Sequence, residues 1–396
     1  MALDSMTVIG VVGAGAMGTG IAQVAARAGH GVVLADARDG ATANARASIA
    51  KSTARDVEKG RMSQSDADAL IARIDFRPEP LSDNLASYSS CGLVIEAVIE
   101  DLETKRALFR QLESVVAAEC VLATNTSSLS VAGIASACER SSRVVGIHFF
   151  NPAPLMSLVE VVPWLGGDPA VANASLDLMQ RWKKTPVMAS DTPGFIVNRV
   201  ARPFYGEALR LLDEGVADVA TIDWAMKDMG GFRMGPFELM DFIGNDVNYA
   251  VTRSVFEAMF FDPRYKPSLT QKRLVESNFL GKKTGRGYYD YRAGATTPEP
   301  AKDANTGLLI FERILAMLIN EAIDAVFMRV ASPEDVDLAM TKGVNYPKGL
   351  LAWANELGLE RVHGWLERLQ AEYGEDRYRP SPLLKRMARE GRRFFE

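Results

Sequence analysis

The sequence predicts an α/β domain built on a doubly wound parallel sheet, followed by two repeated all-helical domains. Over residues 1–190, short apolar runs alternate with segments of helical periodicity, which is the pattern of a parallel sheet covered by helices on both faces. From Asp191-Thr192-Pro193-Gly194 onward the periodicity is helical, so a second domain starts there. Within that helical part, one module occurs twice.

The sheet is predicted from short apolar runs that are flanked by polar or turn-forming residues. The predicted strands are 8–12, 31–36, 93–97, 121–124, 144–149 and 158–162. A helix from Gly15 to Ala28, closed by Gly29, joins the first two strands. This order of strand, turn, helix and strand is the basic unit of a parallel sheet.

The helical repeat is visible in the residue types themselves. Glu207-Ala208-Leu209 and Ile222-Asp223-Trp224-Ala225-Met226 are matched 114 residues later by Glu321-Ala322-Ile323 and Val336-Asp337-Leu338-Ala339-Met340, and Gly235 is matched by Gly349. Near the end of each copy, Pro267-Ser268 and Lys272-Arg273 are matched 113 residues later by Pro380-Ser381 and Lys385-Arg386. The Gly, Thr and Pro content of 293–300 is typical of an extended linker. We therefore expect a sheet domain at 1–190, a first helical domain at 191–292, a linker at 293–306 and a second, structural helical copy at 307–396.

Composition and charge exclude several classes of protein. The formal net charge is −5 and no basic block precedes the last dozen residues, which argues against nucleic-acid binding. No run approaches the roughly 18 apolar residues that span a bilayer, and residues 1–5 lack the features of a signal peptide, so no membrane association is expected. Cys91, Cys120 and Cys138 lack metal-ligand spacing and only three histidines occur, so we expect buried thiols in a reducing cytoplasm and no metal site.

The turn between the first strand and the first helix has the residues of a dinucleotide-binding site. It reads Gly13-Ala14-Gly15-Ala16-Met17-Gly18, and Asp36 follows 18 residues after the last glycine, at the end of the second strand. The three glycines allow a tight turn, the approach of a pyrophosphate and close helix packing, and the helix N-terminus favours the phosphate charge. Asp36 can accept both ribose hydroxyl protons and repels a 2′-phosphate, so the sequence predicts a Rossmann-type domain that binds NAD. Arg38 leaves mixed use with NADP open, and a packing turn without a cofactor is the alternative.

A histidine and a glutamate form the candidate reacting centre. His148 lies at the C-terminal end of the strand 144–149, where doubly wound sheets place their ligands. Glu160 follows 12 residues later on the next strand, a separation suited to a hairpin-like return that brings the two side chains together. Such a pair can take the proton of an alcohol while a hydride leaves the same carbon, because the carboxylate fixes the tautomer and stabilises the imidazolium. A structural histidine at a strand end is the alternative.

With these residues in place, the chain resembles the 3-hydroxyacyl-CoA dehydrogenase family. Seven motifs, in family order from Val8 to about Tyr291, carry the resemblance: Gly13-Ala14-Gly15-Ala16-Met17-Gly18-Thr19-Gly20-Ile21-Ala22, Asn125-Thr126-Ser127-Ser128-Leu129, His148-Phe149-Phe150-Asn151-Pro152, Leu158-Val159-Glu160-Val161-Val162, Asp191-Thr192-Pro193-Gly194-Phe195-Ile196-Val197-Asn198-Arg199, Met234-Gly235-Pro236-Phe237-Glu238-Leu239 and Gly281-Lys282-Lys283-Thr284-Gly285-Arg286-Gly287. The two-copy helical part resembles the subgroup used in phenylacetate breakdown and bacterial fatty-acid oxidation.

The resemblance implies oxidation of an (S)-3-hydroxyacyl-CoA to the 3-oxoacyl-CoA by NAD, with a short or carboxylated acyl chain such as 3-hydroxybutyryl or 3-hydroxyadipyl. It implies that His148 is the base and Glu160 its partner, that Ser127 bonds the substrate oxygen beside the nicotinamide, and that Asn198 reaches the hydroxyl or thioester oxygen. It also places four residues at the cofactor and the closed cleft: Glu100, Lys105, Asn151 and Lys283. From the residues alone, a helix-cap serine, a polar residue at a helix start and a solvated ion pair are the alternatives for Ser127, Asn198 and the Glu100–Lys105 pair.

The CoA contacts implied by the resemblance are Ser52 and Lys59. They are seven residues apart on a predicted helix and so share one face, together with the neighbouring Arg55. A hydroxyl and an ammonium there can both bind the nucleotide end of CoA. An ordinary charged surface explains the same pattern.

The second helical copy departs from the implied site. The position of Asn198 is occupied by Glu312, and Gly281-Lys282-Lys283-Thr284-Gly285 has no counterpart before the chain ends. In one-copy relatives this domain pairs between two chains, so a monomer with an internal pseudo-dimer and a homodimer are both open. The rival activities are oxidation of a 3-hydroxy acid that carries no CoA, and a non-catalytic structural role on the same scaffold.

Overall fold

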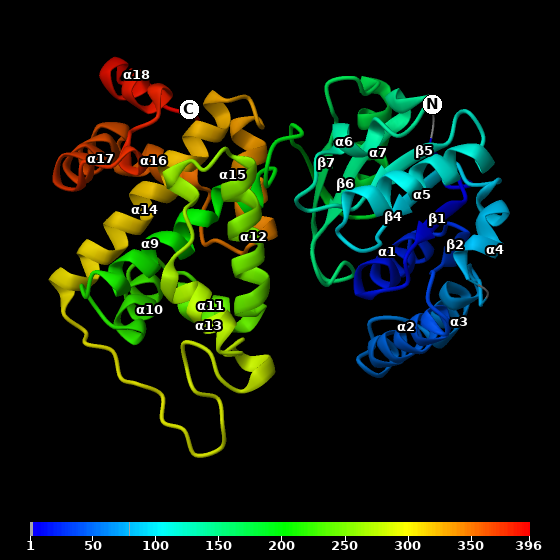
Figure 1. The fold of residues 1–396 in the computed structure, drawn as a ribbon, viewed down its shortest axis with the longest axis horizontal. Coiled ribbons are helices and arrows are strands. Elements are labelled where there is room, and N and C mark those ends of the chain that lie inside the picture. The colour runs from blue at the N-terminus through cyan, green and yellow to red at the C-terminus, as the bar shows by residue number, and fades with distance from the viewer. Residues whose placement is uncertain (1–2, 79) are drawn as a thin grey trace. The chain divides into compact units, whose positions relative to one another are not determined.

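The computed structural model describes residues 3–78 and 80–396. They form two compact units, the first ending at Thr192 and the second beginning at Pro193 (Figure 1). The change of chain character at Asp191-Thr192-Pro193-Gly194 therefore coincides with the division. Both helical copies belong to the second unit and do not separate into two.

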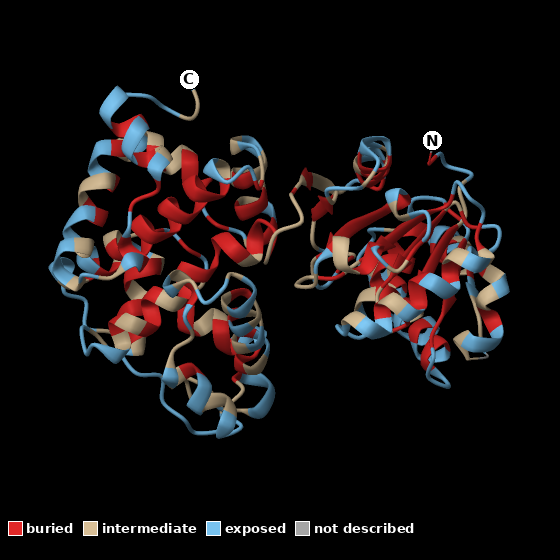
Figure 2. Ribbon diagram, turned by 45° about the horizontal axis from the view of Figure 1, so that its top comes forward, coloured by how far each residue is buried: buried red, intermediate tan, exposed pale blue. Residues whose placement is uncertain are grey.

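The first unit is built around one sheet of eight strands in the order β3-β2-β1-β4-β5-β6-β7-β8. The strands are β1 (Ile9–Val12), β2 (Val32–Ala35), β3 (Ile74–Phe76), β4 (Leu93–Glu96), β5 (Val121–Thr124), β6 (Val144–Phe149), β7 (Leu158–Val162) and β8 (Thr185–Met188). Neighbouring strands are parallel except β6 and β7, which run antiparallel. The central strands are buried along their whole length, as a sheet covered on both faces requires (Figure 2).

Two strands are absent from the sequence prediction, and both lie at the edges of the sheet. Strand β3 has three residues, with Asp75 between its two apolar ones, so it is too short to form an apolar run. Strand β8 contains Pro186, and proline argues against a central strand because it lacks an N–H. Edge strands tolerate both features.

Seven α-helices accompany the sheet in the first unit. They are α1 (Ala16–Arg27), α2 (Ala41–Glu58), α3 (Gln64–Ala72), α4 (Leu81–Asn84), α5 (Leu102–Val115), α6 (Val131–Ala135) and α7 (Pro169–Arg181) among the described residues. The short 3₁₀ turns are η1 (Leu85–Tyr88) and η2 (Ser141–Arg143). Helix α1 begins in the glycine-rich turn, so the turn opens directly onto a helix N-terminus.

The second unit contains the two helical copies. The first comprises α8 (Val197–Val200), α9 (Arg202–Asp213), α10 (Val219–Asp228), α11 (Pro236–Ile243), α12 (Asn245–Ala258), η3 (Pro263–Tyr265), α13 (Leu269–Glu276) and η4 (Lys282–Thr284). The second comprises α14 (Ala304–Phe327), α15 (Pro333–Gly343), α16 (Leu350–Leu357), α17 (Leu359–Tyr373), η5 (Asp376–Tyr378) and α18 (Pro382–Glu390). Helix α14 packs on α9 and α10 of the first copy and on α16, α17 and α18 of its own (Figure 1). In the described part of the chain, no helix is both long enough and apolar enough to cross a membrane.

The repeat is preserved in one detailed packing device. The carboxylate of Asp223 on α10 accepts the backbone N–H groups of Phe237 and Glu238 at the start of α11, at 2.9 Å each. Asp337 on α15 accepts the corresponding groups of Leu351 and Ala352 at 2.8 and 2.9 Å. In both copies the residue before the capped helix is a glycine, and a Cβ there would lie 2.3 Å from the aspartate. The matched Asp and Gly positions are thus explained by a buried cap on a helix N-terminus.

The start of the second copy differs from the expectation. Helix α14 begins at Ala304, so the last three residues of the expected linker are helical, because Asp303 caps the helix by accepting the Thr306 N–H at 2.7 Å. The helix is continuous for 24 residues, whereas its counterpart in the first copy is interrupted at Ala201. The interruption precedes Pro203, whose place in α14 is taken by Met317. Proline cannot donate to the preceding turn, which accounts for the break.

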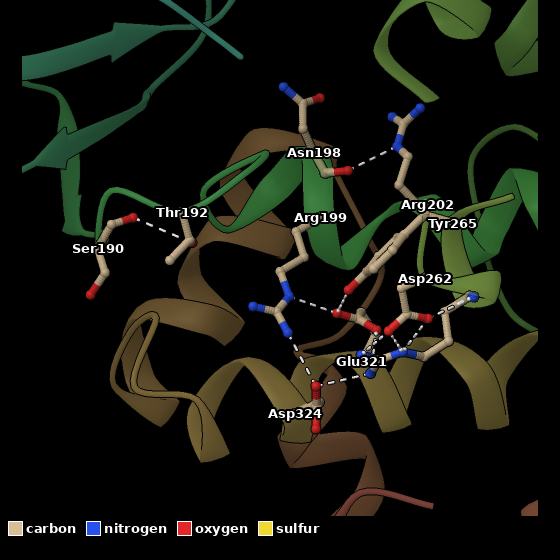
Figure 3. A network of polar contacts seen from close by, with 10 residues as sticks. Ser190, Thr192, Asn198, Arg199, Arg202, Asp262, Tyr265, Glu321 and Asp324 are labelled. Carbon is tan, nitrogen blue, oxygen red and sulfur yellow. Dashed lines mark hydrogen bonds and ion pairs between the residues drawn. The ribbon is translucent and has the colours of Figure 1, made fainter. Parts of the chain in front are cut away.

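Reciprocal ion pairs join the two copies. Arg199 of the first copy contacts Glu321 of the second at 2.7 Å (Figure 3). Arg313 of the second copy contacts Glu207 of the first at 2.6 Å. Both arginines and both glutamates are related by the 114-residue offset. Tyrosine hydroxyls complete each pair: Tyr265 donates to Glu321 at 2.5 Å and Tyr378 donates to Glu207 at 2.6 Å. A contact from residue i to j that is mirrored from j to i is the pattern of a two-fold interface, realised here within one chain.

Candidate active site

The glycine-rich turn has the geometry of a pyrophosphate site. Gly13 has φ +101°, and a Cβ there would lie 2.5 Å from the carbonyl oxygen of Ala97. A Cβ on Gly18 would lie 1.7 Å from the Gly13 oxygen, so only glycine lets α1 start this close to the strand. A Cβ on Gly15 would meet nothing within 4 Å, so the backbone faces open space at the helix N-terminus. The turn is therefore shaped for a phosphate group to approach.

Asp36 stands at the end of β2, next to this turn. Its Oδ2 accepts the Ala14 N–H at 2.6 Å, and its two oxygens accept the Arg38 side chain at 3.1 and 3.3 Å. Burial opposes ionisation, but the hydrogen bonds from Arg38 and Ala14 hold the pKa of Asp36 below its usual value. The Arg38 side chain is 71% exposed, so it can swing away and leave the carboxylate to two ribose hydroxyls. A carboxylate at this position fits NAD and disfavours a 2′-phosphate.

His148 and Glu160 meet as the hairpin spacing predicts. Strands β6 and β7 are antiparallel with the two residues directly opposite each other, and Nδ1 of His148 lies 2.7 Å from Oε2 of Glu160. The side chains are 7% and 1% exposed, so little water competes for this contact. An ionised carboxylate only accepts hydrogen bonds, so beside an ionised Glu160 the ring donates through Nδ1.

Two further groups fix the end of β6 around the imidazole. The Phe150 ring lies 4.5 Å from the His148 ring, centre to centre. Asn125, at the end of β5, accepts the backbone N–H of Phe149 through Oδ1 at 2.8 Å. Asn125 is not among the predicted site residues, although its place directly after a strand and two residues before Ser127 is a usable signal. Asn151 follows in the next turn and is exposed.

The loop that carries Ser127 is held by Glu100. Oε1 of Glu100 accepts the Thr126 hydroxyl at 2.6 Å and the backbone N–H groups of Ser127 and Ser128 at 2.9 and 3.1 Å. Burial acts against it, but the charge of Lys105 and these hydrogen bonds hold the pKa of Glu100 below its usual value. These hydrogen bonds therefore fix the backbone of Ser127, a half-buried residue beside the carboxyl ends of β4 and β5.

Lys105 is 1% exposed, so the alternative of a solvated ion pair is wrong for it. Its ammonium lies 2.5 Å from Glu96 and 3.3 Å from Glu100. Glu96, which the sequence analysis also does not single out, is fully buried and accepts the Thr124 hydroxyl at 2.7 Å. Lys105 therefore contacts two carboxylates, one of which, Glu100, holds the Ser127 loop.

Three further residues implied by the resemblance are Asn198, Lys283 and Ser52. Asn198 and Lys283 belong to the second unit, where the amide of Asn198 points away from the Arg199 ion pairs (Figure 3). The Lys283 ammonium contacts Asp246 at 2.5 Å, and both side chains are partly exposed. Ser52 accepts a hydrogen bond from Gln23 at 3.3 Å, which places it against α1.

The helix expected to carry both CoA contacts ends one residue early. Helix α2 stops at Glu58, and Lys59 is its exposed C-terminal cap residue. Arg55 lies in the last turn of the same helix. Ser52 therefore lies within the second half of α2, and Lys59 directly follows the last residue of the helix.

Known proteins with similar sequences account for nearly the whole chain. Residues 8–192 match the family described as 3-hydroxyacyl-CoA dehydrogenase, NAD binding domain. The C-terminal domain of the same family matches twice, at residues 194–291 and 309–393. The second match corresponds to the second helical copy.

Individual relatives agree with the family match. The chain is 39% identical to 3-hydroxyadipyl-CoA dehydrogenase of Escherichia coli, over 96% of this chain and 97% of that protein. It is 39% identical to 3-hydroxybutyryl-CoA dehydrogenase of Bradyrhizobium diazoefficiens, over 73% of this chain and 97% of the relative. A crystal structure of 3-hydroxybutyryl-CoA dehydrogenase from Escherichia coli superposes with a TM-score of 0.92 at 37% identity, covering 97% of this chain and 98% of the other. The chain belongs to the 3-hydroxyacyl-CoA dehydrogenase family and is an NAD-dependent enzyme.

Proposed function

We propose that the protein oxidises the 3-hydroxyl of an (S)-3-hydroxyacyl-CoA to a ketone, with His148 as the proton acceptor and Glu160 as its partner. The observation that carries the proposal is the buried 2.7 Å contact between Nδ1 of His148 and the Glu160 carboxylate. It lies at the carboxyl end of the sheet that also presents the dinucleotide turn. Ligands of doubly wound sheets bind at this edge.

The residues divide the chemistry as follows. Nε2 of His148 accepts the proton of the substrate hydroxyl, and NAD, when bound, supplies the hydride acceptor for the hydrogen that leaves the same carbon. The buried Glu160 carboxylate stabilises the imidazolium that forms and keeps the ring oriented. Near the site, Asn125 fixes the Phe149 backbone, which limits the freedom of the imidazole.

We assign supporting roles to the remaining residues. Ser127 donates to the substrate oxygen, and Asn198 donates to the same oxygen or to the thioester oxygen. Glu100 and Lys105 shape the Ser127 loop, Asn151 and Lys283 line the cofactor side of the site, and Ser52 and Lys59 bind the nucleotide end of CoA. The glycine-rich turn, Gly13 to Gly18, and Asp36 hold the dinucleotide.

The acyl chain is proposed to be short or carboxylated. One relative, which matches 96% of this chain, is named for 3-hydroxyadipyl-CoA, and another, which matches 73%, is named for 3-hydroxybutyryl-CoA. Comparing kcat/KM over a series of 3-oxoacyl-CoA chain lengths, with and without a terminal carboxylate, identifies the preferred substrate.

The experiment that tests the proposed function measures NADH formation from (S)-3-hydroxybutyryl-CoA and from free 3-hydroxybutyrate. We expect turnover of the thioester, competition by free CoA, and a higher KM for the thioester in Lys59→Ala. Equal turnover of the free acid, without competition by CoA, would favour the rival that acts on a 3-hydroxy acid.

We also propose that the protein is a monomer in which the second copy packs on the first as a partner subunit does in one-copy relatives. The mirrored Arg199–Glu321 and Arg313–Glu207 pairs support this. Light scattering should give a mass near 43.1 kDa, whereas twice that value indicates the homodimer. A cytoplasmic location is proposed on the three free, buried cysteines, which suit a reducing compartment.

A further inference from the structure

A lysine outside the reacting pair contacts the loop that leaves the histidine strand. Lys184 directly precedes β8, whose first residue pairs with the first residue of β7. The loop between β6 and β7, residues 150–157, therefore passes beside it. The Lys184 ammonium donates to the carbonyl oxygens of Ala153 at 2.5 Å and Met156 at 2.7 Å.

This ammonium is held by backbone carbonyls alone. Within residues 3–78 and 80–396, no carboxylate lies within ion-pair distance of Lys184. Burial, and then the like charge of Arg27, lower the pKa of Lys184 to about 8. Keeping a partly buried cation without a counter-charge is costly, so a packing role would be better served by an apolar side chain.

The loop connects Lys184 to the reacting centre on one side. Phe150, its first residue, places its ring 4.5 Å from that of His148. The N–H groups of Leu155 and Met156 both donate to the Pro152 oxygen at 3.0 Å, which makes the middle of the loop a tight turn. The Lys184 ammonium donates to the carbonyls of Ala153 and Met156, and these two hydrogen bonds hold both sides of the turn.

On the other side the loop rests on the nucleotide-binding helix. A Cβ on Gly20 of α1 would lie 3.0 Å from Pro154 and 3.1 Å from Ala153, so loop and helix are in close contact. Helix α1 begins at the dinucleotide turn. A displacement of the loop therefore changes both the packing on His148 and the support of the helix that receives the pyrophosphate.

We propose that Lys184 is a positioning residue for the reaction: through the Ala153 and Met156 carbonyls it holds the β6–β7 loop so that Phe150 keeps the His148 imidazole in its reactive orientation. The inference rests on the proposed role of His148. A lysine that only tied β8 to the loop would contribute to stability and leave the catalytic rate of the folded enzyme unchanged.

The test compares Lys184→Met with Lys183→Met. Methionine keeps the length and removes the donors, and Lys183 is the exposed neighbour of the same charge. For Lys184→Met we expect kcat to fall on the order of 10-fold to 100-fold, as a small misplacement of reacting groups costs. The KM for acetoacetyl-CoA and the melting temperature should change little, whereas the Kd for NADH should rise because the loop also supports α1. Lys183→Met should behave as the unmodified protein.

A second readout is independent of turnover. Hydrogen exchange of the protein without ligands should be faster at the Leu155 and Met156 amides in Lys184→Met, and unchanged there in Lys183→Met. Lys184→Arg, which keeps a charged donor, should recover part of both properties. Unchanged exchange in the loop, an unchanged kcat, or loss of folding in Lys184→Met would each overturn the proposal. Absence of turnover in the unmodified protein would instead contradict the proposed function, and the exchange result would still report on the loop.

Discussion

The first helical copy, α8 to α13, and the second, α14 to α18, share two packing devices and differ at the site residues. Each has an aspartate that caps a helix, α11 in the first copy and α16 in the second, and each contributes one arginine and one glutamate to the mirrored ion pairs. The position of Asn198 is Glu312 in the second copy, and Glu312 contacts Arg361 at 3.0 Å on the surface. Lys283 has no counterpart.

This difference separates what the module needs in order to pack from what the reaction needs. The aspartate cap joins two helices within each copy, and the mirrored pairs join the two copies, so both copies keep them. The proposed role of Asn198 requires a cofactor domain, and one such domain is matched, ahead of the first copy. The second copy is therefore explained as the internal partner of the first.

The largest expected effect concerns the mirrored pairs. Arg313→Met removes the guanidinium that pairs with buried Glu207. Arg199→Met removes one guanidinium from buried Glu321, which keeps Arg264 at 3.5 Å. Removing one partner of a buried ion pair typically costs about 3–5 kcal/mol, so Arg313→Met should lose stability of that order in urea unfolding, and Arg199→Met less. Arg361→Met, in the exposed pair with Glu312, should cost less than about 1 kcal/mol. A loss in Arg313→Met as small as that in Arg361→Met would contradict a stabilising role of the mirrored pairs.

The second largest expected effect is on kcat/KM, which should respond to a substitution in the first copy and not to the matched one in the second. Asn198→Ala should lower kcat/KM by on the order of 10²–10³, the usual effect of removing a donor to a reacting oxygen. Its matched control is Glu312→Ala, the same position in the second copy, which should leave kcat/KM unchanged. A comparable loss in Glu312→Ala would show that the second copy takes part in the reaction.

The smallest effect is a pH dependence of the capping aspartates. Burial raises the pKa of Asp223 to about 7 and also raises that of Asp337. A raised carboxyl pKa means that the folded protein holds a proton which the unfolded chain has released, so the unfolding free energy falls as pH rises from about 4 through 7. Asp223→Asn does not titrate and should flatten this slope by up to about 1.4 kcal/mol per pH unit.

Asp337→Asn should change the slope in the same sense, which makes it the internal comparison for Asp223→Asn. Urea unfolding at a series of pH values between 4 and 8 measures both. A slope that Asp223→Asn leaves unchanged would contradict the raised pKa of its buried carboxyl.

The sequence predicts most of the fold because its signals are local. The buried strands are continuous apolar runs, and the repeat shows in matched residue types such as Asp223 and Asp337. Strand β8 escapes prediction because Pro186 is unusual in a strand, and its place is decided by pairing with β7. The start of α14 depends on a single side-chain cap at Asp303, which a linker-like composition conceals.

The part of the candidate site that can be predicted is the pair of residues that lie opposite each other on two neighbouring strands. His148 and Glu160 are 12 residues apart on strands joined by a short loop, so their contact follows from the hairpin. The burial of Lys105 cannot be predicted from the sequence, because its ion-pair partner Glu96 belongs to a buried strand. Lys184 is likewise recognisable only once β8 is known to lie beside the β6–β7 loop.

The central claim is that the His148 imidazole accepts the substrate proton. The measurement that tests it most directly is kcat for NADH-dependent reduction of acetoacetyl-CoA in His148→Gln, with His363→Gln in the helical unit as the matched control. We expect kcat to fall on the order of 10²–10⁴ in His148→Gln, the usual contribution of a general acid–base group, and to stay normal in the control. Near-normal turnover in a folded His148→Gln would contradict it.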